Sequence, residues 1–478
     1  MTPTQLSEIK TQQQDETAET SLKYMLKLAA PMVITNISFT VMQFVDRFMV
    51  SRLGTDALAA ILPAGMVSFL PASFAIGVIT SVATFVSQSL GKAQLKDCSN
   101  YYWQAIYMGL AYYAVVLAIM WPMAPQIFQI LGHSKTVANM EVTYFRIVLL
   151  ACFLAIFNWT SSQFFMGIHR PIITMYASLC GQAVNIIANY VLIFGKLGFP
   201  TMGIAGAGWG TFMGIATGAA INLTMFLGSD INTTFKSRQT INVDLSKMKD
   251  LLKVGIAAGF TLMVNVAVWG VILFGLAGKF GKEPLAATSA VFSYINVSVM
   301  PIVGIGTALT AAVGKTIGAG KKSLAIKQTN VCLRIALIYM GAVGACFFIF
   351  RNTLMAFWSS DEKVIAAGVN ILICASIFQV FDAATIIYNG SLRGAGDTRW
   401  LAGISTLGAI LILGLGGSLI VKFFPELGVL GPWLAATFCI IFVGLANRWR
   451  FKSNRWMKID LFKQRALGVP VETGAVVE

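Results

Sequence analysis

The sequence predicts an all-α membrane protein of 12 transmembrane helices, arranged as two six-helix lobes. The chain has 478 residues, of which 56% are hydrophobic and only 12% are charged, and its mean hydropathy is +0.73. Soluble globular proteins carry roughly twice that share of charged residues, so most of this surface must face lipid. Two further observations, long apolar segments and an internal repeat, predict the helix number and the lobes.

The apolar segments between polar breaks each contain about 20 residues or more, enough to cross about 30 Å of hydrocarbon. We expect bent helices in the second and eighth segments, because both are long and they contain Pro63, Pro71 and Pro301. The predicted spans are 25–51, 58–90, 100–123, 140–166, 172–195, 202–227, 250–278, 285–317, 328–350, 364–391, 400–422 and 428–447.

The distribution of basic residues predicts the orientation. With both termini placed in the cytoplasm, the large majority of the 35 Lys and Arg residues fall on inner segments, as the positive-inside rule requires. Residues 1–22 then form a cytoplasmic tail, whose acids and lack of an apolar core are unlike a signal peptide, and 449–478 form a basic cytoplasmic tail. The net charge of +15 indicates contact with anionic lipid of the inner (plasma) membrane and no nucleic-acid partner.

An internal repeat relates the two halves of the chain. The segment that begins at Leu53 aligns without a gap with the segment that begins at Phe280, an offset of 227 residues. Six spans in each half place both halves in the membrane in the same sense, so their pseudo-twofold axis lies along the membrane normal. The aligned pairs include Leu58 with Leu285, Gly77 with Gly304, Thr80 with Thr307, Gly91 with Gly318, and Met166 with Arg393.

The repeat divides the chain into an N-lobe (23–227), a cytoplasmic linker (228–249) and a C-lobe (250–448). Two lobes around a central site are typical of secondary transporters that work by alternating access. The chain has no phosphate-binding Gly-rich loop and no segment long enough for a nucleotide-hydrolysing domain, so an ion gradient or a partner must supply the energy. A passive channel is a further interpretation, which a demonstration of uphill transport would remove.

Two carboxylates lie well inside apolar spans, Asp46 in the first and Asp382 in the tenth. A charge at this depth is costly, and acids that persist there usually mark ion pathways. Each acid follows a glutamine by three residues, Gln43 and Gln379, which places amide and carboxylate on one helical face. We expect a functional role for both acids.

Other polar side chains within spans are candidates of lower specificity. Asn185 and Asn189 lie one turn apart in the fifth span, where their carbonyl oxygens suit either a cation site or hydrogen bonds between helices. The scattered cysteines and the two loop histidines predict no metal cluster, no cofactor and no disulfide framework. Candidates for the wall of a substrate cavity, each as readily explained by helix packing, are Asn36, Asn158, Gln163, Tyr294, Asn296 and Phe378.

Several motifs together resemble the multidrug and toxic compound extrusion (MATE) family. Residues 391–399 (SLRGAGDTR) resemble its loop after helix ten, and VDRFMVSRLGTDALAA from Val45 is similar to its helix-one signature. The segments FPTMGIAGAGWGT from Phe199 and FPELGVLGPWLA from Phe424 look like two further family motifs. The resemblance covers nearly all twelve spans. It implies a V-shaped pair of six-helix lobes that export organic cations or other amphipathic compounds, coupled to entry of Na⁺ or H⁺.

The resemblance also implies roles for individual residues. Asp46 matches the N-lobe carboxylate of the coupling site, where Na⁺ would bind, and Asn185 and Asn189 match its helix-five partners. Thr211 matches a contributor from helix six, and Asp382 matches the C-lobe acid of the NorM-like branch.

This sequence departs from the family pattern at three positions. Asn189 stands where the DinF-like branch has Asp, which favours the NorM-like branch. NorM-like members carry Glu in helix seven, where the nearest residue here is Asn265, and a tyrosine expected before the C-lobe acid is Phe378. The C-lobe polar site of Asp382, Gln379 and Asn265 is therefore incomplete, and we expect coupling at the N-lobe site.

Two alternative functions remain open at this stage. A lipid-linked oligosaccharide flippase of the wider superfamily would need basic residues in its cavity, whereas only Arg47 and Arg146 lie within spans. A membrane-embedded transferase enzyme would need clustered His, Asp or Asn residues at one membrane face, and the two loop histidines, His133 and His169, are far apart in sequence. We therefore expect no enzyme activity, and a monomer, because a two-lobe chain needs no partner to form its cavity.

Overall fold

The computed structural model describes residues 21–130 and 134–462, apart from the side chains of 55, 58, 62 and 271–274. These described residues form helices and connecting turns with no strand. Twelve helical segments are long and apolar enough to cross a membrane, which confirms the predicted number. Most of the two predicted tails, and His133, lie outside the described residues.

The first six spans form the N-lobe. The second span consists of two helices, because the helix is interrupted at Thr80. A further short helix, outside the six spans, follows the last span. The N-lobe helices are α2 (Leu22–Ser51), α3 (Thr55–Ile79), α4 (Ser81–Gly91), α5 (Leu95–Ile130), α6 (Lys135–Gly167), α7 (Ile172–Phe194), α8 (Ile204–Leu227) and α9 (Ser229–Phe235).

The remaining six spans form the C-lobe, in which two spans contain π-helical segments, η1 (Val268–Leu273) and η2 (Gly408–Gly416). A short helix that the sequence did not predict, α14 (Arg351–Trp358), precedes the tenth span. The other helices are α10 (Leu245–Ala267), α11 (Phe274–Gly278), α12 (Lys282–Gly318), α13 (Lys322–Ile349), α15 (Glu362–Gly394), α16 (Thr398–Leu407), α17 (Gly417–Phe423) and α18 (Leu430–Lys452), with short 3-10 turns at Pro425–Leu427 and Arg455–Lys458.

The interruption of the second span does not fall at a proline. Pro63 and Pro71 lie inside the continuous helix α3, and Pro301 lies inside the continuous helix α12. The prolines at which the sequence predicts bends therefore interrupt neither helix. A proline inside a helix removes one hydrogen bond, and neighbouring helices can compensate for that loss within a membrane protein.

The C-lobe begins earlier than the predicted boundary at residue 250. The side chain of Asp244 accepts hydrogen bonds from the backbone amides of Ser246 and Lys247, at 3.0 and 3.1 Å, so α10 begins at Leu245. An aspartate at this position satisfies amides that have no partner within the helix. Hydropathy placed the start too late because the first turns of α10 are charged.

The predicted linker is a structured part of the N-lobe. Trp103 Nε1 donates to the backbone oxygen of Ser237 at 2.8 Å, and the hydroxyl of Tyr107 donates to that of Ile241 at 2.6 Å. Lys247 Nζ lies 2.6 Å from the carboxylate of Asp97 at the start of α5. The segment between the lobes is thus held along α5 before the chain enters the C-lobe.

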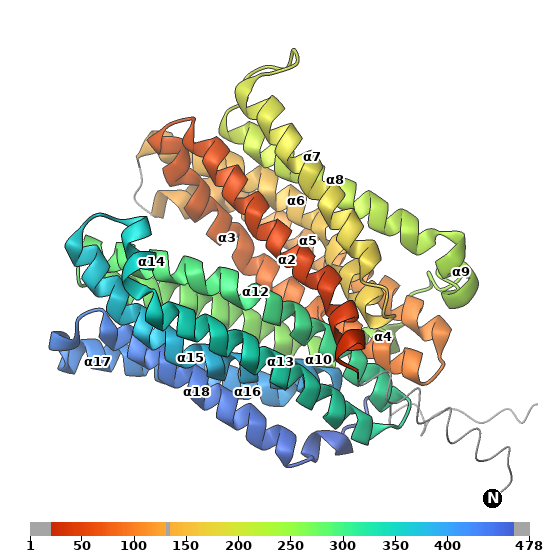
Figure 1. The fold of residues 1–478 in the computed structure, drawn as a ribbon. Helices are drawn as coiled ribbons and strands as arrows, with labels where there is room; N and C mark the ends of the chain where they lie inside the picture. Colours follow the sequence, from red (N-terminus) through yellow and green to blue (C-terminus); the bar gives the residue numbers. More distant parts are fainter. Residues whose placement is uncertain (1–20, 131–133, 463–478) are drawn as a thin grey trace, which may run out of the picture.

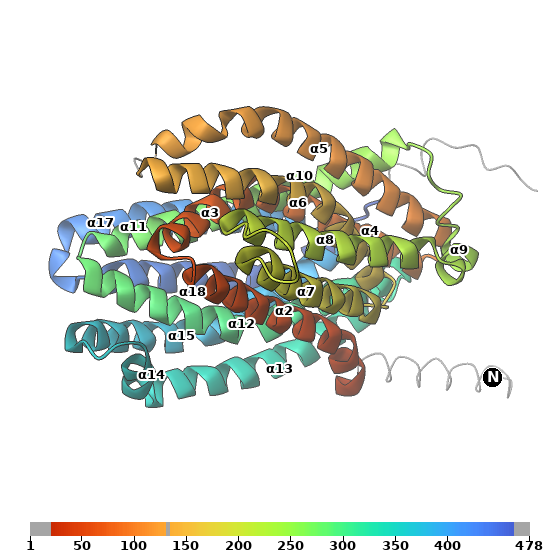
Figure 2. The same ribbon diagram turned by 90° about the horizontal axis from the view of Figure 1, so that it is seen from above.

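The two lobes approach each other at one end of the bundle and diverge toward the other (Figure 1). The closed end, as we call it, holds the start of α2 and the C-terminal ends of α4, α12 and α15. The splayed end holds the α2–α3 and α7–α8 turns. Viewed from above, α2 lies between α7 of its own lobe and α12 of the other lobe, and it packs against both (Figure 2).

Glycines at the closed end give direct evidence of the pseudo-twofold axis. A Cβ atom at Gly91 would lie 2.1 Å from the backbone oxygen of Lys315, and one at Gly318 would lie 2.2 Å from that of Gln88. Gly318 and Lys315 follow Gly91 and Gln88 by the 227 residues of the repeat. The same contact is therefore made twice, with the lobes exchanged, as in an isologous interface.

Hydrogen bonds join the lobes at the same end. Gln88 Nε2 donates to the backbone oxygen of Gly394 at 2.9 Å, and the hydroxyl of Thr84 donates to that of Arg393 at 3.0 Å. His169 Nε2 lies 3.2 Å from the backbone oxygen of Ala311. Toward the splayed end, the side chain of Asn36 makes a longer contact of 3.4 Å to the backbone oxygen of Met300.

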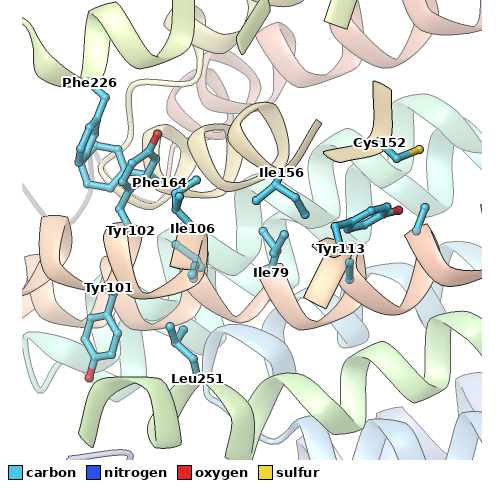
Figure 3. Packing of buried hydrophobic residues seen from close by; sticks show 14 of the residues in the cluster. Ile79, Tyr101, Tyr102, Ile106, Tyr113, Cys152, Ile156, Phe164, Phe226 and Leu251 are labelled. Carbon is cyan, nitrogen blue, oxygen red and sulfur yellow. The ribbon is translucent and has the colours of Figure 1, made fainter. Parts of the chain in front are cut away.

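Buried aromatic side chains hold the N-lobe together. Tyr102 stacks on Phe226 with ring centroids 3.7 Å apart, and Phe164 meets both rings edge to face (Figure 3). The hydroxyl of Tyr102 lies 3.1 Å from that of Ser161. Because α5, α6 and α8 each supply one of these rings, the cluster fixes three spans relative to one another.

Candidate functional site

The packing of α7 against α8 prepares the N-lobe site. A Cβ atom at Gly210 would lie 2.0 Å from Asn189 Oδ1, and one at Gly214 would lie 2.7 Å from the Cβ of Asn185. Glycines at this spacing let two helices approach closely in a membrane. The close approach leaves Asn185 and Asn189 buried at the interface, with exposed fractions of 2% and 0%.

One chain of hydrogen bonds links α2, α7 and α8. Asn189 Nδ2 donates to Asp46 Oδ1 at 2.7 Å and makes a longer contact of 3.4 Å to Asn185 Oδ1. Asn185 Nδ2 lies 3.4 Å from the hydroxyl oxygen of Thr211, which itself donates to the backbone oxygen of Ala207. The structure thus brings together four of the five residues that the sequence analysis placed at the N-lobe site.

The fifth residue, Gln43, lies apart from this chain of hydrogen bonds. Its side chain is exposed, and among the described residues it makes no hydrogen bond to Asp46. Spacing by three residues places two side chains on the same side of a helix, but Asn189 on the neighbouring helix supplies the amide instead. The expected contact between Gln43 and Asp46 is therefore wrong.

The site contains oxygen atoms that suit a small hard cation. The carboxylate of Asp46 accepts from Asn189 Nδ2, and the carbonyl oxygens of the two asparagines and the hydroxyl of Thr211 belong to the same chain of hydrogen bonds. Asn189 Oδ1 is buried and accepts no hydrogen bond from the described residues. A buried acceptor without a donor is costly, and a cation or a proton at this site would compensate it. The residues present therefore fit Na⁺ or H⁺ as a ligand.

Two neighbouring residues on α6 escaped the sequence analysis. Tyr144 is partly buried and packs against the small core cluster that contains Val50 and Ala207, and Glu141, one turn earlier, is fully buried. Glu141 lies close to the predicted start of its span, so position alone suggested an exposed helix end. Its spacing of three residues from Tyr144, which places both on one helix face, was the available signal.

The C-lobe polar site is more loosely arranged. Gln379 Nε2 donates to the hydroxyl of Ser298 on α12 at 2.8 Å, and not to Asp382. Gln379 Oε1 is buried and has no hydrogen-bond partner among the described residues. The side chains of Asp382 and Asn265 likewise make no hydrogen bond or ion pair with the described part of the chain. These three residues therefore do not form a connected cluster.

Most of the cavity candidates serve helix packing. Asn158 and Tyr294 donate to backbone oxygens on other helices, at 2.9 and 3.0 Å, and Asn36 does so across the lobes, whereas Asn296 donates at 2.9 Å to Phe292 on its own helix. Phe378 is buried and stacks on Trp433 with an interplanar angle of 7°. Phe378 was wrongly placed on a cavity wall, because its helix face packs on α18. Gln163 is partly buried on α6.

Asn222, which the sequence analysis did not select, completes a second polar contact in the N-lobe. Its Nδ2 donates to Asn158 Oδ1 at 2.9 Å, so α6 and α8 are joined by an amide pair. Among the described residues, no group of three or more His, Cys, Asp or Glu side chains is placed to hold a metal ion. The Asp46 cluster, as we call the hydrogen-bonded residues Asp46, Asn185, Asn189 and Thr211, is the connected polar site of the N-lobe.

Comparison with known proteins identifies the family. The MatE family profile matches residues 31–191 and 260–416, which is one segment in each lobe. The chain belongs to the MatE family. A relative from Halalkalibacterium halodurans, named "Probable multidrug resistance protein NorM", is 26% identical over 91% of this chain and 95% of its own. A protein of the same name from Photorhabdus laumondii is 28% identical over 82% of this chain and 88% of its own.

Solved structures share the MatE fold. The eukaryotic MATE transporter AtDTX14 superposes with a TM-score of 0.82 at 19% identity, covering 95% of this chain and 98% of its own. A multidrug resistance MATE family transporter described as outward-facing gives 0.83 at 19% identity, covering 93% and 99%. This MatE chain is therefore a multi-pass membrane protein with the two-lobe architecture that the sequence predicts.

Proposed function

We propose that this protein is a cation-coupled antiporter that exports organic cations or other amphipathic compounds by alternating access between its two lobes. The observation that carries the proposal is the Asp46 cluster, in which a carboxylate within the membrane is held by Asn189 at 2.7 Å. The multidrug resistance names of its relatives support the substrate class. Na⁺ or H⁺ is the coupling ion.

The position of α2 explains how ion binding would act on the lobes. Asp46 lies on α2, which packs against both α7 of the N-lobe and α12 of the C-lobe. A ligand shifts a conformational equilibrium only if it binds the two states with different affinity. A cation bound between α2 and α7 alters how α2 sits against α12, and this difference supplies the coupling.

The basic residues at one end support an orientation of the protein in the membrane. The closed end carries the start of α2 and the basic end of α18, which includes Arg450 and Lys452. Positive residues favour the cytoplasmic side, so the closed end faces the cytoplasm of the inner membrane and the splayed end faces outward. The surrounding partner is the lipid bilayer, and the protein functions as a monomer.

The test is efflux of a fluorescent cationic dye from vesicles that contain the purified protein. An imposed Na⁺ gradient and an imposed H⁺ gradient are compared for the native chain, Asp46→Asn and Asp56→Asn. Asp56 is an exposed acid near the same end of the N-lobe and serves as the matched control.

We expect one gradient to drive efflux by the native chain and by Asp56→Asn, and Asp46→Asn to lose it. Native efflux rates in Asp46→Asn would refute the assigned coupling site. A folded protein without efflux under either gradient would refute the proposed antiport.

A further inference from the structure

The last described residues of the chain cross from one lobe to the other. After α18, Trp456 is buried in the C-lobe, and the backbone oxygen of Met457 accepts a hydrogen bond of 2.6 Å from Lys322 Nζ. This anchors the segment on the C-lobe. Residues 460–462, which we call the strap, then leave that surface and pack against the hydrophobic core of the N-lobe.

Phe462 makes the main contact of the strap with the N-lobe. Its ring meets the ring of Phe85 on α4 edge to face, with centroids 6.2 Å apart at 81°. Phe85 is fully buried and stacks in turn on Tyr101 of α5. The Nζ of Lys92 lies 4.0 Å from the centroid of the Phe462 ring, within the range of a cation–π contact.

The other two residues of the strap, Asp460 and Leu461, also lie at the contact between the lobes. Leu461 lies on Gly396 in the α15–α16 turn, where an added Cβ atom would be 2.7 Å from Leu461 Cδ1. Asp460 Oδ1 accepts a hydrogen bond from the backbone amide of Phe462 at 3.0 Å and lies 4.0 Å from Lys92 Nζ. Because both charged side chains are substantially exposed, this ion pair contributes little, and Phe462 contributes most.

We propose that the strap is a releasable clasp that holds the closed end shut. It is anchored on the C-lobe, and it contacts α4 of the N-lobe beside the hydrogen bonds from Thr84 and Gln88 that also join the lobes. If the lobes part at this end, Phe462 must leave Phe85 and Lys92. The strap therefore stabilises the state in which the closed end is shut and sets how readily it opens.

The clasp rests on the proposed function only in that opening of the closed end is a step of transport. Its test measures the distance between the lobes and does not depend on transport. Spin labels are attached at Lys96→Cys on α5 and Lys327→Cys on α13, two exposed positions near the closed end on different lobes. The exposed Cys180 and Cys346 are replaced by Ser. Pulsed electron paramagnetic resonance then gives the populations of short and long distances between the lobes.

We expect Phe462→Ala to raise the ratio of long to short distances by about 3- to 10-fold, the range expected for loss of an aromatic contact. Asp460→Asn should change the ratio by less than about 3-fold. Phe357→Ala is the matched control, because this phenylalanine is 84% exposed on α14 at the splayed end. An unchanged ratio in a folded Phe462→Ala variant would overturn the proposal.

A second measurement does not depend on the folding of Phe462→Ala. Cysteines at Lys92 and Asp460 are joined by a flexible, reducible cross-linker. We expect the cross-link to remove the long-distance population and its reduction to restore it. A long-distance population that persists in the cross-linked protein would contradict the clasp, whereas absence of dye efflux would bear only on the proposed function.

Discussion

A single methyl group at Gly91 should open the closed end. Gly91 is the last residue of α4 and faces the end of α12 across the seam between the lobes. Its backbone does not require glycine, because its φ lies outside the left-handed region. Gly91→Ala therefore acts by placing a methyl group in the contact between the lobes, and not by straining the backbone of residue 91.

The structure gives the size of the effect. The new Cβ would lie 2.1 Å from the backbone oxygen of Lys315, whereas a carbon–oxygen contact normally spans about 3.3 Å. Helix backbone cannot move aside as a flexible side chain can, so the two helix ends must separate by about 1 Å. Overpacking of this kind costs about 1–3 kcal/mol. Since only the shut state contains this contact, the equilibrium should shift by about 5- to 140-fold.

The assay is the distance measurement between labels at positions 96 and 327. We expect Gly91→Ala and its counterpart Gly318→Ala to raise the long-distance population to a similar extent, because the repeat makes their contacts equivalent. Gly403→Ala on α16 is the control, since an added Cβ there meets nothing within 4 Å. If Gly91→Ala gave the same distances as Gly403→Ala, the contact would not govern closure.

Three further substitutions test the stability of the fold by the midpoint of thermal unfolding in detergent. Lys247→Met should lower the free energy of unfolding by about 3 kcal/mol, because it removes a cation that is only 7% exposed and lies 2.6 Å from the Asp97 carboxylate, and a Lys247→Met/Asp97→Leu double variant should recover part of it. Arg393→Met should raise the midpoint, because the buried Nε of Arg393 has no partner among the described residues and the repeat places Met166 at the equivalent position. Phe226→Ala should cost about 3–5 kcal/mol by removing a fully buried ring from the aromatic cluster, and an unchanged midpoint would contradict its assigned role.

The features that the sequence predicted correctly are those that depend on the lipid or on the repeat. Twelve spans follow from length and apolarity, because an unbroken helix is the economical way to satisfy backbone groups within hydrocarbon. The 227-residue offset predicted equivalent contacts, and Gly91 and Gly318 show them. The scarcity of acids within spans was enough to select Asp46, although Glu141 was missed beside a helix end.

Helical spacing by itself did not predict partners across helices; only the family resemblance placed Asn185 and Asn189 beside Asp46. The pattern of Gln43 and Asp46 was the same as that of Gln379 and Asp382, yet neither glutamine hydrogen-bonds its acid. Helical spacing states which side chains share a face, but it does not state which neighbouring helix meets that face or how closely.

By itself, then, the sequence determined how many helices cross the membrane, how they group into two lobes, and that Asp46 and Asp382 lie inside spans. Only the tertiary structure decided that Asn189 and not Gln43 donates to Asp46, that the lobes are shut at one end, and that Phe462 returns to Phe85. The physical reason is the distance along the chain over which each signal acts. Hydropathy and periodicity describe a single helix, whereas these contacts form between helices that are far apart in the chain. Glycines at the interfaces permit that close approach.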